Sequence, residues 1–195
     1  MAGEKLYTFI EPRKKFSFFS IKDFFRYKDL LYYMVLRDIT VQYKQTILGL
    51  GWAILNPLFQ IIIFSFIFGN LAGLKPDVAN MPYPLFSTLA VIPWTYFSSS
   101  LSSACSSLIT SSPIFTKVYF PRIIIPLTPV FSKLFDFLIS MIILVGLMIY
   151  YQFYPGKNLV LVAWPLLIII VTSAGLGFWL SALSLQYRDV RFALS

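Results

Sequence analysis

Apolar residues along the chain gather in four long stretches separated by short polar segments. They run near residues 52–71, 85–109, 123–151 and 159–185, and each reaches the roughly 20 apolar residues that a membrane-spanning helix needs. Backbone groups inside a bilayer must be hydrogen-bonded within the protein, so the stretches are predicted to be helices. The alternating ten-residue pattern of a membrane barrel is absent from the sequence. The predicted fold is therefore an all-α, polytopic helical membrane protein with at least four transmembrane helices.

A segment of different character, residues 28–46, precedes the first apolar stretch. At about 100° per residue, Arg37, Thr40 and Lys44 share one face of a helix, and the other side is largely apolar. That pattern is typical of an amphipathic helix lying in the membrane interface with its apolar side in lipid. A plain basic flank that stops translocation is the alternative. Two glycines shortly after the segment permit a sharp turn into the first span.

Composition and charge strengthen the membrane interpretation. Hydrophobic residues make up 58% of the 195 positions and charged residues only 12%, against about 25% charged in soluble domains. The net charge is +8, and nine of the sixteen Lys and Arg residues come before residue 45, beside the apolar stretches. An anionic membrane surface is thus the expected electrostatic partner rather than nucleic acid. Basic flanks also place the N-terminus, the second loop and the C-terminal end in the cytoplasm.

Several chemistries are excluded by the residues that the sequence lacks. It has no His and a single cysteine, Cys105, so metal-ligand clusters and imidazole bases are not expected. It has no phosphate-binding loop of the GxxxxGK[ST] type. The apolar stretches hold no Glu and a single Asp, too little for a carboxylate proton relay. The chain is therefore predicted not to be an enzyme, to carry no cofactor, and to take its energy from a partner.

The second loop, "ITSSPIFTKVYFPRIIIP", has the signals of a short cytoplasmic helix. Ser112 before Pro113 resembles an N-cap followed by the first helical residue. Aromatic residues would form one side, and Pro121 would end the helix before the third span. A short helix with an exposed aromatic side suits docking to another protein. An ordinary interfacial loop anchored by its aromatics is the alternative.

Polar residues within the apolar stretches raise two further questions. The second stretch is rich in Ser and Thr, which either permit close helix packing or line a polar path for sugars. Lys133 and Asp136 lie three residues apart on the third stretch, where intramembrane charge invites a functional interpretation. Counting back about 20 residues from the outer end of that stretch places Lys133 near the cytoplasmic interface. An i,i+3 ion pair is therefore the preferred interpretation.

Three segments together resemble the membrane subunit of polysaccharide-exporting ABC transporters, the type-2 exporter group. They are "LRDITVQYKQTILGLGWAILNPLFQIIIFSFIFG", "SSPIFTKVYFPRIIIP" and "QYRDVRFAL", and the resemblance covers about residues 28–193. The pattern RD-x4-YK-x3-LG-x2-W-x4-P is specific because it combines eight residue types over about twenty positions. It is carried by Arg37, Asp38, Tyr43, Lys44, Leu48, Gly49, Trp52 and Pro57.

The resemblance implies two contacts with an ATPase subunit. The amphipathic segment would be the interface helix, with contact residues Arg37, Asp38, Thr40, Tyr43 and Lys44. The second loop would supply a coupling helix at about residues 111–121, seated in a groove of that subunit. Its implied contact residues are Ser112, Pro113, Phe115, Lys117, Tyr119, Pro121 and Arg122.

It further implies a transporter of two membrane subunits, as a homodimer, and two ATP-binding cassette subunits that hold ATP and Mg. The cargo would be an O-antigen-like polysaccharide on undecaprenyl diphosphate, moved across the bacterial inner membrane. Aromatic faces and hydroxyls would line its path. The candidate path residues are Trp52, Tyr96, Phe97, Ser98 and Ser102. The alternatives are a permease for small molecules or drugs and a membrane scaffold without transport activity.

The family also sets an expectation for domain organisation. Residues 1–27 would be a cytoplasmic arm, and residues 28–195 the transmembrane domain. Such subunits usually have six spans, whereas four are counted here. The last two spans and the outer gate segment are thus expected to be missing, as in a fragment or a truncated gene.

Overall fold

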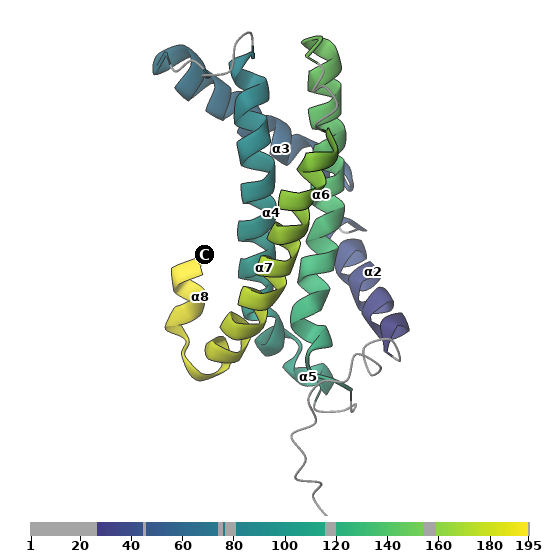
Figure 1. Ribbon diagram of the computed structural model, residues 1–195. Coiled ribbons are helices and arrows are strands. Elements are labelled where there is room, and N and C mark those ends of the chain that lie inside the picture. The colour runs from purple at the N-terminus through teal and green to yellow at the C-terminus, as the bar shows by residue number, and fades with distance from the viewer. Residues whose placement is uncertain are drawn as a thin grey trace, which may run out of the picture.

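The chain folds as a bundle of long helices (Figure 1). A computed structural model describes residues 27–44, 46–73, 76, 81–115, 120–153 and 159–194. Within these ranges there is no β-strand. The prediction of an all-α fold is therefore confirmed.

The helices begin and end close to the boundaries of the apolar stretches. In chain order they are α2 (Lys28–Lys44), α3 (Gly51–Phe64), the π-helix η1 (Ser65–Leu71), α4 (Tyr83–Thr110), α5 (Ser112–Phe115), α6 (Ile124–Tyr150), α7 (Leu159–Gln186) and α8 (Asp189–Leu194).

Three helical stretches of the described chain are long and apolar enough to cross a membrane. They are Gly51–Leu71, formed by α3 and η1, then Ile124–Tyr150 and Trp164–Gln186. The second expected span, α4, has 28 residues and is about 42 Å long, but it does not reach the same hydropathy. Four of its hydroxyl side chains, Ser87, Thr88, Ser100 and Ser107, are buried, and α4 contacts α3, α6, α7 and α8. A helix surrounded by protein needs less apolar surface than one surrounded by lipid.

The contact between α4 and α7 is close because small residues meet there. Gly177 is buried, and a Cβ atom at this position would lie 3.0 Å from the Cβ of Ala104. Two turns further along α7, the Ser184 hydroxyl donates a 2.6 Å hydrogen bond to the backbone oxygen of Cys105. Close backbone approach and interhelical hydroxyl bonds are the means by which helices associate in lipid. The Ser184 hydroxyl of α7 thus contributes to this helix packing.

The helix α2 lies beside the lower half of α6 as drawn in Figure 1. Its residue Lys44 is followed by a turn in which Gly49 has a φ of +51°, a conformation that glycine adopts without strain. The next helix, α3, starts at Gly51. The predicted glycine turn between the amphipathic helix and the first span is therefore confirmed at Gly49.

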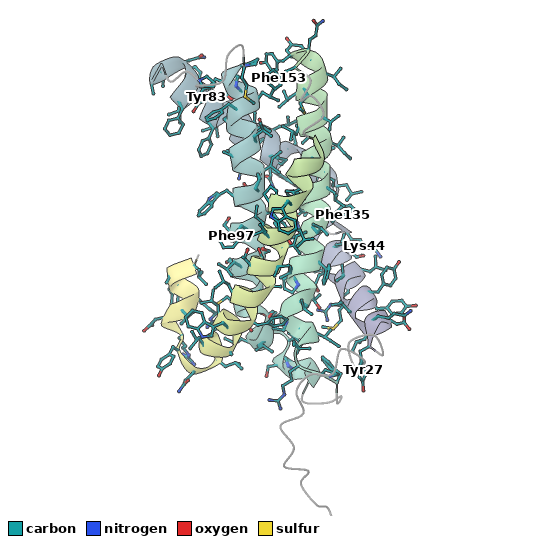
Figure 2. The ribbon with its side chains drawn as sticks, in the orientation of Figure 1. Tyr27, Lys44, Tyr83, Phe97, Phe135 and Phe153 are labelled. Carbon is teal, nitrogen blue, oxygen red and sulfur yellow. The ribbon has the colours of Figure 1, made fainter. Side chains whose placement is uncertain are left out.

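The two ends of the bundle differ in what they carry. Tyr83 and Phe153 lie at one end and Tyr27 at the other (Figure 2). The helix α5, the start of α6 and the turn between α7 and α8 share the end that carries Tyr27 (Figure 1). The start of α2, α5, the start of α6 and the α7–α8 turn, which belong to or adjoin the segments that the positive charges assign to the cytoplasm, therefore lie at one end of the bundle.

Replacing Gly177 by Leu is expected to lower the free energy of unfolding by about 1–3 kcal/mol, the usual cost of overpacking a close contact. The matched control is Gly175→Leu on the same helix, since Gly175 is exposed and has nothing within 4 Å of its added Cβ. Both changes raise helix propensity equally, so the difference between them isolates the α4–α7 contact. Thermal unfolding in detergent measures it, and equal midpoints for the two variants would contradict the packing described here.

Candidate functional site: a polar network between α2 and α6

One side of α2 packs against the rest of the protein. Leu31 and Met34 are buried and form a hydrophobic cluster with Leu108, Ile124 and Ile125. The apolar side of this helix was expected to lie in lipid. In the structure it is partly covered by α4 and α6 instead, because both helices present large aliphatic residues at that level.

The opposite side of α2 carries most of the residues expected to contact an ATPase subunit. Arg37, Thr40 and Lys44 are exposed, and Asp38 is half-buried. A guanidinium nitrogen of Arg37 lies 2.8 Å from a carboxylate oxygen of Asp38. Tyr43 differs from the other four because it is buried and its ring faces Phe135 of α6, with the ring centres 6.2 Å apart. Figure 2 shows Lys44 and Phe135 at the level where α2 ends.

Four polar side chains join the end of α2 to α6, and we call them the α2–α6 network: Gln42, Tyr43, Lys133 and Asp136. The Lys133 ammonium donates to the Gln42 amide oxygen at 2.9 Å and lies 3.5 Å from an oxygen of Asp136. The Gln42 amide nitrogen donates to Asp136 at 3.1 Å and to the Tyr43 hydroxyl at 2.8 Å. The Tyr43 hydroxyl donates to the other Asp136 oxygen. The predicted i,i+3 ion pair is thus confirmed, within a larger set.

The network affects the chemistry of Tyr43. Burial, and then the hydrogen bond to the Asp136 carboxylate and its negative charge, raise the pKa of the Tyr43 hydroxyl above its ordinary value of 10. The hydroxyl therefore stays protonated and acts as a hydrogen-bond donor at physiological pH. Asp136 lies twelve residues into α6, about 18 Å from the start of that helix. Asp136 is partly buried in the bundle, and α2 and Lys133 provide its hydrogen-bonding and charged partners.

Two cavities meet at the network. The α3 cavity, of about 400 Å³, lies between α3, α4 and α6. Its polar lining includes Asn56, Gln60 and Thr95. The α2 cavity, of about 480 Å³, lies between α2, α4 and α6, and seven of its fifteen lining residues are Ser or Thr. Gln42 and Lys133 line both cavities.

The expected coupling helix is only partly within the described residues. Ser112 and Pro113 belong to α5, whose last residue is Phe115. Lys117 and Tyr119 lie outside the described residues. Two later positions are not helical: Phe120, which is buried, and Pro121. The helix therefore does not extend to residue 121 as expected, because the chain turns at Pro121 to begin α6. Arg122, beside that turn, is exposed.

The candidate path residues do not share one surface. Trp52 and Tyr96 line the α3 cavity, although Tyr96 is buried and donates a 3.2 Å hydrogen bond to the backbone oxygen of Val130. The ring of Phe97 lies 6.2 Å from that of Trp94. Ser98 and Ser102 line two other pockets on α4. A single polymer path formed by all five residues is not seen in this subunit alone.

Sequence reasoning missed the role of Gln42. In the sequence it only interrupts the apolar side of the amphipathic helix, and its partners lie more than ninety positions away. The available signal was the coincidence of an unexplained amide on one helix with an isolated charge pair on another. Only the packing of α2 on α6 shows that they meet.

Replacing Asp136 by Ala is expected to lower the free energy of unfolding by about 1–3 kcal/mol, because Lys133, Gln42 and Tyr43 each lose a partner. The matched control is Asp38→Ala, whose partner Arg37 is 44% exposed and lies on the outer side of α2. It should cost about 0.5 kcal/mol or less. Unfolding titrations with sodium dodecyl sulfate measure both variants, and a loss at Asp136 no larger than that at Asp38 would contradict the stabilising role of the network.

Comparison with known proteins agrees with this architecture. A family model described as ABC-2 type transporter matches residues 29–194. An "O-antigen export system permease protein RfbA" of Myxococcus xanthus is 26% identical over 175 residues, which are 90% of this chain and 66% of that protein.

Two proteins of the same name from Klebsiella pneumoniae are 30% and 31% identical over 166 residues, or 83% of this chain and 61% of each relative. The chain therefore spans just under two thirds of the length of the relatives that it matches. Because the family match extends over most of the chain and the helices are long and apolar, we conclude that this is a multi-pass membrane protein that belongs to the ABC-2 type transporter family.

Proposed function

We propose that the chain is the transmembrane subunit of an ABC transporter that exports lipid-linked polysaccharide. The observation that carries the proposal is the likeness to three proteins named O-antigen export system permease, each over more than four fifths of this chain. The cargo would be an O-antigen-like polymer on undecaprenyl diphosphate. ATP hydrolysis would take place in a separate subunit, since the sequence holds no phosphate-binding loop.

The proposed assembly contains two copies of this chain and two ATP-binding cassette subunits, which hold ATP and Mg. Exposed apolar residues of α3, such as Phe59, Ile62 and Ile63, suit a helix that meets either lipid or a second copy. The proposed location is the bacterial inner membrane with the N-terminus in the cytoplasm. Support comes from the basic residues in the flanks of the sequence and from the start of α2, the start of α6 and the α7–α8 turn, which lie at the end of the bundle that carries α5.

In the proposed mechanism, ATP binding draws the two cassette subunits together, and α5 and α2 follow as levers. A displacement of α2 would be transmitted to α3, the start of the first span, because only the short turn at Gly49 separates the two helices. It would reach α6 through the α2–α6 network. Arg37 and Lys44 on the exposed side of α2 would attract either the cassette subunit or the diphosphate of the cargo.

Co-purification of an ATP-binding cassette subunit with the chain, followed by reconstitution in liposomes, tests this function. We expect lipid-linked oligosaccharide to stimulate ATP hydrolysis and to reach the opposite leaflet. Stimulation by small apolar drugs, with no response to the lipid-linked saccharide, would instead indicate a drug permease. Failure of any ATPase to co-purify would indicate a scaffold and refute the proposal.

The double variant Arg37→Ala, Lys44→Ala is expected to lower lipid-linked export about tenfold, the loss that follows from about one charge-assisted contact. Lys28→Ala is the matched control, since Lys28 is exposed on the same helix but lies nine residues from Arg37, roughly 180° around the axis. Initial rates of ATP hydrolysis and of export are measured in the reconstituted complex. If both rates are unaltered in the double variant, these two residues are needed neither for contact with the cassette subunit nor for attracting the diphosphate of the cargo.

A further inference from the structure

The α2 cavity and the α3 cavity are neighbours along the same two helices. Both are walled by α4 and α6, and they differ in the third wall, which is α2 for one and α3 for the other. Ser99 lines the α3 cavity, and Ser103, four residues further along α4, lines the α2 cavity. Residues four apart lie on the same face of a helix. The boundary between the cavities therefore falls within one turn of α4.

The α2–α6 network lies at the same boundary between the cavities, on α2 and α6 rather than on α4. Gln42 and Lys133 line both cavities, whereas Tyr43 and Asp136 line the α3 cavity. The direct contact between Gln42 and Lys133, at 2.9 Å, connects α2 to α6 across the space that would otherwise join the two cavities. The Gln42 amide nitrogen is held in turn by Asp136 at 3.1 Å.

Both cavity linings contain polar groups that can hydrogen-bond to water, among apolar ones. In the α2 cavity, the hydroxyls of Ser107, Thr128 and Ser132 donate to backbone oxygens of their own helices, so they present their free lone pairs to the cavity. In the α3 cavity, the Thr95 hydroxyl lies 3.1 Å from the amide oxygen of Gln60. A polar cavity of this size can be hydrated, unlike an apolar one.

Other residues of α2, and residues of α3 beyond the turn that follows it, line the two cavities. Gln42 and Tyr43 stand at the C-terminal end of α2, whose earlier residues Met34 and Arg37 line the α2 cavity. Beyond the turn at Gly49, residues Trp52 and Asn56 of α3 line the other cavity. A displacement of α2 away from α6 would therefore break the network and shift a wall of each cavity at once.

We propose that the α2–α6 network is a removable partition between two hydrated cavities of one subunit. While its hydrogen bonds are intact, Gln42 and Lys133 separate the cavities. When α2 moves from α6, the cavities join into one polar passage along α4 and α6. In this arrangement Gln42 is a positioning residue that acts through Lys133 and Asp136. The partition itself does not depend on which cargo the transporter carries.

Cysteine accessibility tests the partition. Cys105 is the sole cysteine of the sequence, so Cys105→Ser provides a background for two matched reporters on one face of α4, Ser99→Cys and Ser103→Cys. The protein is reconstituted in liposomes and treated with a cationic, membrane-impermeant methanethiosulfonate. With the network intact, we expect Ser103→Cys to react and Ser99→Cys to react about tenfold more slowly. A factor of about ten corresponds to the free energy of about one charge-assisted hydrogen bond, which must break before the reagent reaches Ser99→Cys.

The partition is then weakened by Lys133→Met or by Gln42→Leu, each combined with each reporter. Either change should raise the rate at Ser99→Cys about tenfold and leave the rate at Ser103→Cys within about twofold. Lys28→Met is the matched control, because it removes a cation of α2 that lies outside the network and lines neither cavity. It should change neither rate.

Three results would overturn the proposal. The first is equal reactivity of the two reporters with the network intact. The second is an unchanged Ser99→Cys rate in both network variants. The third is equal acceleration at both reporters, which is the signature of general loosening of the bundle. Since labelling requires neither cargo nor ATPase, a negative export assay would refute the proposed function while leaving the partition standing.

Discussion

Close packing of α6 and α7 on α4 is the interaction on which the rest of this structure depends. Helices inside a bilayer gain little from burying apolar surface, because lipid tails are as apolar as the protein interior. Association therefore requires small residues and shared hydrogen bonds. Gly177 against Ala104 and the Ser184 hydroxyl on the backbone of Cys105 provide both. On α4, the hydroxyl-bearing residues Ser87, Thr88, Ser100 and Ser107 are buried at the centre of the bundle.

The second constraint is the cost of a charged pair far along α6. Lys133 and Asp136 stabilise each other only in part, since their closest approach is 3.5 Å. Gln42 and Tyr43 supply the remaining hydrogen bonds, and they come from a helix that is otherwise amphipathic and partly exposed. The charge pair therefore selects where α2 lies. It also makes the attachment of α2 polar and reversible, unlike the aliphatic contact near Leu31.

These two contacts differ in a way that suits a transport subunit. The helices α4 and α7 are held by close approach at Gly177, which permits little relative movement. The attachment of α2 to α6 consists of long polar side chains next to cavities, where water can replace each hydrogen bond. In the proposed transporter, movement applied to α2 would be absorbed at this polar attachment and at the Gly49 turn, while the central helices keep their packing.

The sequence by itself determined the helical class, the approximate ends of the long helices, the glycine turn and the pairing of Lys133 with Asp136. All of these follow from local rules: apolar length, the conformational freedom of glycine, and the spacing of side chains on one helix. The family motifs were equally visible, because they consist of residue types at fixed separations.

Only the tertiary structure decided which polar residues meet across the bundle. It turned Tyr43 inward, brought Gln42 to a charge pair more than ninety positions away, and buried Tyr96 against the backbone of α6. It also distributed the five candidate path residues over different faces of α4 and its neighbours. Helix periodicity specifies which side chains share a face. The partner of that face depends on the crossing of helices far apart in the chain, which no local pattern encodes.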